Sequence, residues 1–242
     1  MVKRLLWEQE IGGSNPLTPT SARTSWMRWR NGDRRFPYHG SAHCPVDALP
    51  KSLEDVTMRP MADTQGIKTA QELFDMPADE FSYELIHGEL RRMSKPGAKH
   101  GMIAMRLGGW LFHHVEKNDL GLVLAAETGF QLAPDHVRAP DVAFIRKGRI
   151  DERGIPAKQW PGAPDLAIEV LSPNDTYSYM QEKACDWIGY GTRMVLVVDP
   201  DKRLVSVYRS RQEVRVLTVD EAIDGGDIVP GWRVEIGDLF RE

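Results

Sequence analysis

The segment MVLVVDP at residues 194–200 is an uninterrupted apolar run of strand length. Such strands are typical of a sheet that is covered on both faces, because both sides of the strand have to be buried. The segments before it have, in order, the patterns of a helix, a hairpin, a long helix, three strands and a helix, and a β-rich part follows it. This order predicts an α/β fold in which helices lie on both faces of a sheet.

Periodicity predicts the individual elements. The predicted helices are 69–76, with Thr69 as its N-cap, 99–118 and 177–189. A hairpin is predicted within 81–94, with its turn at His87-Gly88. The predicted strands are 122–133, 141–146, 163–172, 194–200, 203–210, 213–219 and 231–240. The segment 147–164 carries Gly, Pro and charge and is expected to be a surface loop.

The helix predicted at 99–118 has one apolar face, whose members are Ile103, Leu107, Trp110, Leu111 and Val115. Two glycines at 108 and 109 weaken this helix by about 1 kcal/mol each relative to alanine. We expect them to let another backbone approach closely.

Residues 1–64 differ from the rest of the chain. They are rich in Pro, Gly, Ser and Arg and show neither a helical nor a strand period. We expect a disordered N-terminal extension followed by one domain at 65–242. The Arg/Trp mixture between Arg23 and Arg35 would also suit a nucleic-acid-binding arm. A third interpretation is that translation begins at Met61.

Charge and cysteine content narrow the function classes. A formal net charge of −4 does not by itself favour nucleic-acid binding. The two cysteines, Cys44 and Cys185, form neither a CxxC pair nor a zinc-type spacing, so we expect a reducing, cytoplasmic location. No apolar run approaches the roughly 20 residues that a membrane span needs.

Glu169 interrupts the apolar segment APDLAIEVLS at 163–172. Burying an ionised carboxylate without a partner is costly, so we expect a cation beside it. Alternation along the strand places Glu169 on the same face as Asp165 and Ala167. In the preceding strand, Asp141 shares a face with Ala143. The small alanines leave room for an ion and a substrate.

If these two strands pair, Asp141 and Glu169 come within reach of one divalent cation. Mg²⁺ prefers oxygen ligands and typically takes one or two protein carboxylates together with water and phosphate oxygens. Such an ion acidifies water and neutralises charge that develops on a phosphate. Lys183, on the following helix, is the ammonium that we expect to hold the attacking water or the transition-state oxygens.

Six segments of the chain resemble, in order and spacing, the Uma-type putative restriction endonuclease family of the PD-(D/E)xK nuclease superfamily. They are YELIHGEL, KHGMI, APDVAFI, APDLAIEVLSPNDT, the series Lys183, Trp187, Gly191 and VVDP, and IVPGWRVEIGDLF, within about residues 65–241. The lysine that the superfamily pattern places two residues after Glu169 is Leu171 here. In this branch of the superfamily the lysine lies on the following helix, which matches Lys183.

The resemblance implies a restriction-endonuclease-like core, with a mixed central β-sheet flanked by helices, and hydrolysis of phosphodiester bonds with Mg²⁺, or with Mn²⁺ as a substitute. It implies that Asp141, Glu169 and Glu84 bind the metal and that they form the catalytic set together with Lys183. The expected substrate contacts are His100, Arg92 and Lys99. The implied partner is nucleic acid, DNA in the first place, with a homodimer left open and no membrane.

Other interpretations stay open from the residues alone. Glu84 is also an ordinary exposed acid of a hairpin, His100 a helix-capping residue and Lys183 a solvated helical lysine. The same fold would also suit a nucleic-acid-binding module that has lost its chemistry, or a small-molecule phosphoesterase. Basic residues cluster at 91–99 and 146–149, and if they contact phosphates, affinity falls steeply as salt rises.

Overall fold

A computed structural model describes residues 66–77, 79–93, 95–152, 154–173 and 175–241. The predicted extension at 1–64, with its Arg/Trp segment and the alternative start at Met61, lies outside the described residues. In the described part, no helix is both long enough and apolar enough to cross a membrane.

The central sheet has six strands in the order β11-β10-β9-β8-β6-β3. It consists of β3 (Gly121–Ala125), β6 (Val142–Arg146), β8 (Leu166–Val170), β9 (Met194–Asp199), β10 (Leu204–Tyr208) and β11 (Val214–Leu217). Only β8 and β9 pair in parallel, and the other neighbours are antiparallel, so the sheet is mixed. All six residues of β9 are buried, as its continuous apolar sequence predicts.

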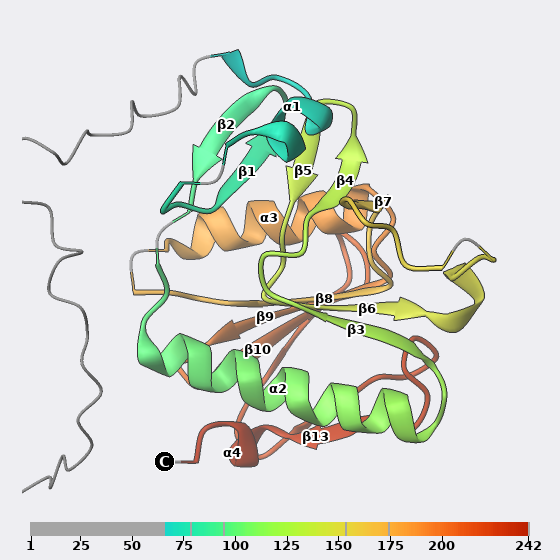
Figure 1. The fold of residues 1–242 in the computed structure, drawn as a ribbon. Coiled ribbons are helices and arrows are strands. Elements are labelled where there is room, and N and C mark those ends of the chain that lie inside the picture. The colour runs from blue at the N-terminus through green and yellow to red at the C-terminus, as the bar shows by residue number, and fades with distance from the viewer. Residues whose placement is uncertain (1–65, 78, 94, 153, 174, 242) are drawn as a thin grey trace, which may run out of the picture. The chain divides into compact units, whose positions relative to one another are not determined.

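Helices cover both faces of this sheet (Figure 1). α2 (Ala98–Lys117) lies on one face together with the C-terminal part of the chain, where β13 (Arg233–Glu235) pairs with β12 (Ala222–Asp224) and leads into α4 (Ile236–Leu239). α3 (Tyr177–Gly189) lies on the other face. The predicted α/β restriction-endonuclease-like fold, with helices flanking a mixed central sheet, is therefore confirmed.

A second sheet lies on the far side of α3 (Figure 1). Its order is β2-β1-β5-β4-β7, and its strands are β1 (Tyr83–Ile86), β2 (Glu89–Arg92), β4 (Phe130–Ala133), β5 (His136–Arg138) and β7 (Trp160–Pro161). The predicted hairpin is confirmed as β1–β2. Its turn residues His87 and Gly88 both have positive φ, 50° and 77°, the backbone conformation that tight hairpins require.

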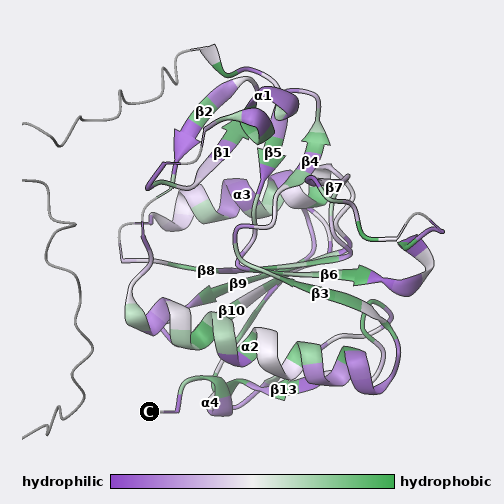
Figure 2. Cartoon of the chain, in the orientation of Figure 1, coloured by the Kyte–Doolittle hydropathy of each residue, from purple (hydrophilic) through white to green (hydrophobic). Residues whose placement is uncertain are grey.

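The apolar residues around the central sheet divide into two layers, one on each of its faces, and a smaller third cluster includes Leu85 and Val137 of the second sheet. Val142, Phe144 and Ile168 point into the α2 layer, whereas Ala143 and Ala167 point into the α3 layer. Figure 2 shows this as hydrophobic colour concentrated on the central strands and on the side of α2 that faces them. The predicted alternation along both acid-bearing strands is therefore confirmed.

The three predicted helices are present with small shifts at their ends. α1 (Ala70–Asp75) begins with the predicted cap, because the Thr69 hydroxyl accepts from the Glu72 amide and the Glu72 side chain reaches back to the Thr69 amide. On α2, Ile103, Leu107, Leu111 and Val115 are buried. Trp110 is 38% exposed, so its assignment to the buried face was wrong. Its position lies at the edge of the apolar stripe, about 80° from the centre.

Three other predictions need correction. The strand predicted at 122–133 is two strands, β3 and β4, which belong to different sheets because Glu127, at φ 69°, turns the chain between them. The segment 231–240 is only partly β, since α4 takes its second half. The loop predicted at 147–164 contains a 3₁₀ turn, η4 (Lys147–Arg149), and β7, whose Trp160 is buried. The short strands β5 and β7 carry too few residues for a recognisable period.

Candidate active site

Asp141 and Glu169 come together through the pairing of β6 with β8. The ladder aligns Val142 with Ile168, and one step further Asp141 stands opposite Glu169. The Asp141 Oδ2 atom accepts a hydrogen bond from the Val170 amide at 2.7 Å and lies 3.0 Å from Nε2 of His100. The carboxyl group of Asp141 is thus held against the end of β8.

Lys183 reaches this place from α3. Thr176 is the N-cap of this helix, since its hydroxyl accepts from the Tyr179 amide, and Lys183 lies about two turns in. Its side chain is buried, with the residue 4% exposed. The ammonium group lies 3.0 Å from Oε2 of Glu169 and 3.1 Å from Oε1 of Glu84, and it donates to the Ala139 carbonyl at 3.2 Å. An ammonium has three donors, and here it has three acceptors.

Glu84 comes from β1 of the second sheet, and it is buried instead of exposed. Its Oε1 atom also accepts from the Ala139 amide at 3.0 Å, and its Oε2 atom accepts from the Arg138 guanidinium at 3.2 Å. Lys183 therefore joins a carboxylate of the central sheet to a carboxylate of the second sheet.

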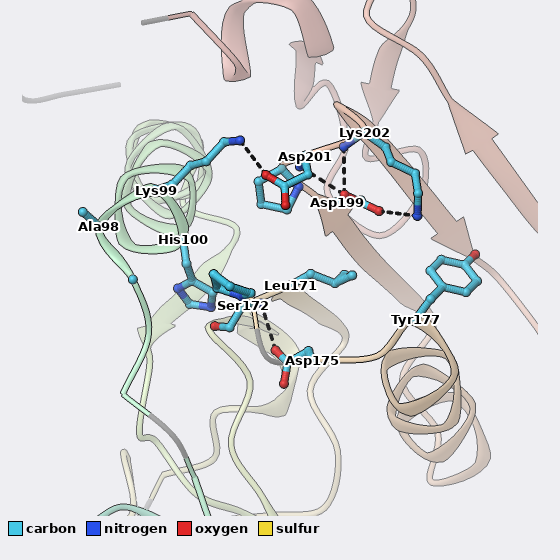
Figure 3. Close-up of a pocket in the computed structure, with 13 residues that line it drawn as sticks. Ala98, Lys99, His100, Leu171, Ser172, Asp175, Tyr177, Asp199, Asp201 and Lys202 are labelled. Atoms are coloured by element: carbon cyan, nitrogen blue, oxygen red, sulfur yellow. Dashed lines mark hydrogen bonds and ion pairs between the residues drawn. The ribbon is translucent and has the colours of Figure 1, made fainter.

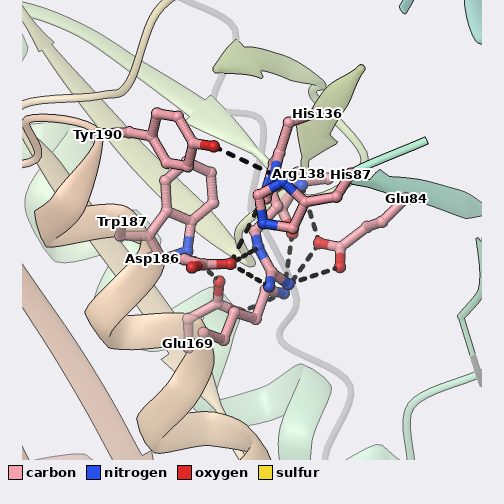
Figure 4. A network of polar contacts seen from close by, with 10 residues as sticks. Glu84, His87, His136, Arg138, Glu169, Asp186, Trp187 and Tyr190 are labelled. Atoms are coloured by element: carbon pink, nitrogen blue, oxygen red, sulfur yellow. Dashed lines mark hydrogen bonds and ion pairs between the residues drawn. The ribbon is translucent and has the colours of Figure 1, made fainter. Parts of the chain in front are cut away.

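A polar network surrounds the two carboxylates, Glu84 and Glu169 (Figure 4). The fully buried guanidinium of Arg138 bridges Glu84 to Asp186, a residue of α3, with its Nε atom 3.0 Å from Oδ2 of Asp186. The Trp187 indole donates to Oε1 of Glu169 at 2.7 Å. Both oxygens of Glu169 are therefore held by donors from α3, which fixes the orientation of this carboxyl group.

Burial and charge shift the two central groups. The pKa of Glu169 is raised to about 7, mainly by burial; the charges of Asp141 and Glu84 add to the rise, whereas Lys183 and the Trp187 hydrogen bond oppose it. Burial acts to lower the pKa of Lys183, but the charges of Glu169 and Glu84 outweigh this and raise it above the usual lysine value. Lys183 is therefore an ammonium at neutral pH, and it faces more carboxylates than it can neutralise.

His100, near the start of α2, faces the same carboxylates. Burial lowers the pKa of His100, but its hydrogen bond to Asp141 and the negative charge of that residue raise the pKa above its ordinary value on balance. The Nδ1 atom of His100 is buried and has no hydrogen-bond partner among the described residues. When the ring is protonated, this nitrogen is a donor that is still available to an acceptor.

Most of the expected site residues line one cavity, which has a volume of about 330 Å³. Six of the seven do so: Glu84, Arg92, His100, Asp141, Glu169 and Lys183. Lys99 does not; it lines an adjoining cavity of about 440 Å³ and pairs with Asp201 at 2.8 Å (Figure 3). Asp165, on the same strand face as Glu169, lies away from the cavity and caps the Arg146 amide instead.

The sequence interpretation missed several residues of this site. Tyr179 and Asp175 line the cavity, and Arg138 and Asp186 lie behind it. Tyr179 lies four residues before Lys183, and this helical spacing was a usable signal. For Arg138, a charged residue in a three-residue strand, no local signal distinguishes a buried position from an exposed one.

The donor set suits a hard divalent cation with few protein ligands. Among the described residues, no group of three or more His, Cys, Asp or Glu side chains is arranged to hold a metal ion. Mg²⁺ does not require such a group, because one or two carboxylates with water and phosphate oxygens suffice. Asp141 and Glu169 face each other across two paired strands and line the same cavity, and their mutual repulsion would be relieved by a cation.

Two comparisons with known proteins find a similarity to nucleases that are described as putative. The sequence model of the Uma2 family, described as a putative restriction endonuclease, matches residues 70–237. A crystal structure of a putative nuclease belonging to DUF820 from Anabaena variabilis is similar to the chain, with a TM-score of 0.63 and 27% sequence identity, covering 71% of this chain and 97% of that one. No curated protein matches the chain.

Proposed function

Because this chain belongs to the Uma2 family of putative restriction endonucleases, we propose that its acidic cavity hydrolyses phosphodiester bonds, in DNA in the first place, with the help of a divalent cation. One observation carries this proposal. The ammonium of Lys183 is held between two buried carboxylates, Glu169 and Glu84, in a cavity that Asp141 also lines. Carboxylates, an ammonium and room for a substrate are the parts that metal-assisted phosphodiester hydrolysis needs.

Asp141 and Glu169 are the proposed metal ligands. A bound Mg²⁺ or Mn²⁺ would supply positive charge against the phosphodiester and acidify water. Glu84 was expected to be a third metal ligand, but its contacts favour a different role. Its Oε1 atom holds Lys183 and the Ala139 amide and its Oε2 atom holds Arg138, so its main role is to anchor the lysine.

Lys183 supplies a fixed positive charge. Because it stays protonated, it does not act as a proton acceptor; it stabilises negative charge next to Glu169 and orients that carboxyl group. Burial raises the pKa of Glu169 to about 7, and a cation bound by Asp141 and Glu169 would lower it again and keep this carboxyl group ionised as a ligand. The available donor of His100 and the exposed guanidinium of Arg92 are the proposed contacts to substrate phosphate oxygens.

The test uses the purified full chain with plasmid, linear duplex and single-stranded DNA, with Mg²⁺ or Mn²⁺ and with a chelator. We expect cleavage with the metal and none with the chelator. Glu169→Gln and Lys183→Met should each abolish cleavage. Glu182→Gln is the matched control, since Glu182 is an exposed neighbour of Lys183 on α3 and should keep full activity.

The outcomes separate the alternatives. Cleavage that survives Glu169→Gln would contradict the proposal. Binding without cleavage would favour a nucleic-acid-binding module without catalysis. Turnover of a nucleotide ester with no action on DNA would favour a small-molecule phosphoesterase. Homodimerisation and the cytoplasmic location stay predictions, to be tested by sedimentation and by cell fractionation.

A further inference from the structure

The catalytic cavity is one of four adjoining cavities that share their walls. On one side, His100, Ser172 and Asp175 separate it from the cavity of Figure 3. On the other side, it shares Met93, Pro96 and Asp141 with a cavity of about 180 Å³. That cavity shares Ser82, Met93, Glu127 and Ala139 with a fourth, of about 410 Å³. Each cavity thus shares lining residues with the next, and the four are called the groove below; Glu84, Asp141 and Glu169 all line the second of them.

Three aromatic side chains that line these cavities each have a cation over the ring. Tyr177 lies in the cavity of Figure 3, with the ammonium of Lys202 at 5.6 Å from its ring centre. Phe81 lies beyond Asp141, with the guanidinium of Arg92 at 4.3 Å. These two pairs flank the catalytic cavity on opposite sides.

The third pair lies at the far end of the groove. The ammonium of Lys158 lies 5.0 Å from the ring centre of Phe74, and both line the fourth cavity. Phe74 and Tyr177 are each 43% exposed, so part of each ring is open to solvent. Three of the four cation–π contacts among the described residues therefore have their ring in one of these adjoining cavities.

We infer that the groove binds an unpaired polynucleotide strand, which passes from Tyr177 over the carboxylates to Phe81 and Phe74. This inference rests on the proposed function and specifies its substrate. Proteins that hold single strands combine cations along the backbone with aromatic rings on which bases stack. In a duplex the faces of the bases are already stacked on one another, so these rings would find no partner.

The charged residues of the groove fit a strand whose bases stack on the rings better than they fit a duplex held by electrostatic attraction. Lys99 and Lys202 are paired with Asp201 and Asp199. In the described part of the chain, Arg91 and Lys95 form no ion pair, so they are available to phosphates near the centre of the groove. The formal net charge of −4 does not by itself favour duplex binding, which usually relies on a basic surface.

The experiment measures fluorescence anisotropy with the full chain and three labelled 20-nucleotide probes: a DNA strand, an RNA strand of the same sequence, and the DNA duplex. Binding is measured with a chelator and again with Ca²⁺. We expect at least one single strand to bind at least tenfold more tightly than the duplex, and the two strands distinguish DNA from RNA. Tyr177→Ala and Phe74→Ala should each weaken strand binding about fivefold or more.

Phe112→Ala is the matched control, because Phe112 is an equally exposed aromatic residue on α2, at 52%, and lines none of the four cavities. Its strand affinity should stay unchanged. Tighter duplex binding, no binding of either strand, or equal effects of all three variants would overturn the inference. If one of these binding results is obtained while the wild type cleaves with metal and Glu169→Gln does not, the inference fails but the proposed function stands. Strand binding with cleavage that survives Glu169→Gln would reject the proposed function alone.

Discussion

The Nζ atom of Lys183 lies 3.0 Å from Oε2 of Glu169, and both groups are buried. The two residues come from α3 and β8, the helix and strand that also supply most other contacts of this site. Two charges in such a place stabilise each other only while both are present, because each has lost its hydration. The four predictions below follow from this pair and from the packing around it.

Removing the ammonium should destabilise the fold. Lys183→Met leaves Glu169 and Glu84 as buried carboxylates without their shared cation, so we expect a loss of about 3–5 kcal/mol in the free energy of unfolding. Urea unfolding in the presence of a chelator measures it. The double variant Lys183→Met/Glu169→Gln should lose less than the two single variants summed, since they share one interaction. Lys147→Met, which breaks an exposed pair with Asp119, should cost less than about 1 kcal/mol.

Replacing Arg138 should destabilise the fold about as much as replacing Lys183 does. Its guanidinium joins Glu84 to Asp186, so Arg138→Gln removes the cation of Asp186 and leaves Glu84 with Lys183 alone, and it should cost about 3–5 kcal/mol. Arg138→Lys should recover only part of this, because an ammonium lacks the fork that reaches both partners. Differential scanning calorimetry of both variants shows whether Arg138→Lys is more stable than Arg138→Gln and less stable than the wild type. Arg215→Gln, at an exposed pair, is the control, and a loss as large as that of Arg138→Gln would contradict the argument.

His136 should make the protein less stable in acid. Burial, with the positive charge of Arg138, lowers the pKa of His136 below its ordinary value, and its Nε2 atom lies 3.7 Å from Oδ2 of Asp186, too far for a hydrogen bond. Below about pH 6.5 the unfolded chain therefore takes up a proton at this position before the folded chain does, and stability falls as pH decreases.

The test compares melting temperatures of the wild type and His136→Gln between pH 8 and pH 5. The other titrating groups are common to both proteins, so the difference reports His136. We expect the wild type to lose more stability across this range than the variant does. Parallel pH profiles would show that the folded and unfolded states bind the proton at His136 equally well.

The two glycines of α2 should respond oppositely to alanine. An alanine Cβ at Gly109 would meet only the flexible end of Met105, at 3.8 Å, so Gly109→Ala should stabilise the helix by about 0.5–1 kcal/mol. At Gly108 the Cβ would lie 3.1 Å from Cγ2 of Val142, the neighbour of Asp141. We expect Gly108→Ala to be neutral or destabilising in thermal unfolding, and an equal gain at both positions would contradict this.

Much of the site's framework could be predicted from local pattern. The alternation of acids and alanines on β6 and β8 followed from the two-residue period of a strand, and the bounds of α3 followed from its cap and its periodicity. The expectation that another backbone approaches the glycine pair was wrong: Gly108 lies close to the Val142 side chain, and Gly109 lies near only the end of Met105. Trp110 was misplaced because a helical face has edges that a period alone does not define.

What the sequence by itself determined is therefore which residues share a face of each element: Asp141 with Ala143, Glu169 with Ala167, and Lys183 on the helix that follows. Only the tertiary structure decided that Glu84 of another sheet shares the Lys183 ammonium, and that Arg138 is buried behind it. The physical reason is that periodicity depends on neighbours along the chain. The partner of a buried charge depends on which distant segments pack together, and the local sequence carries no record of that choice.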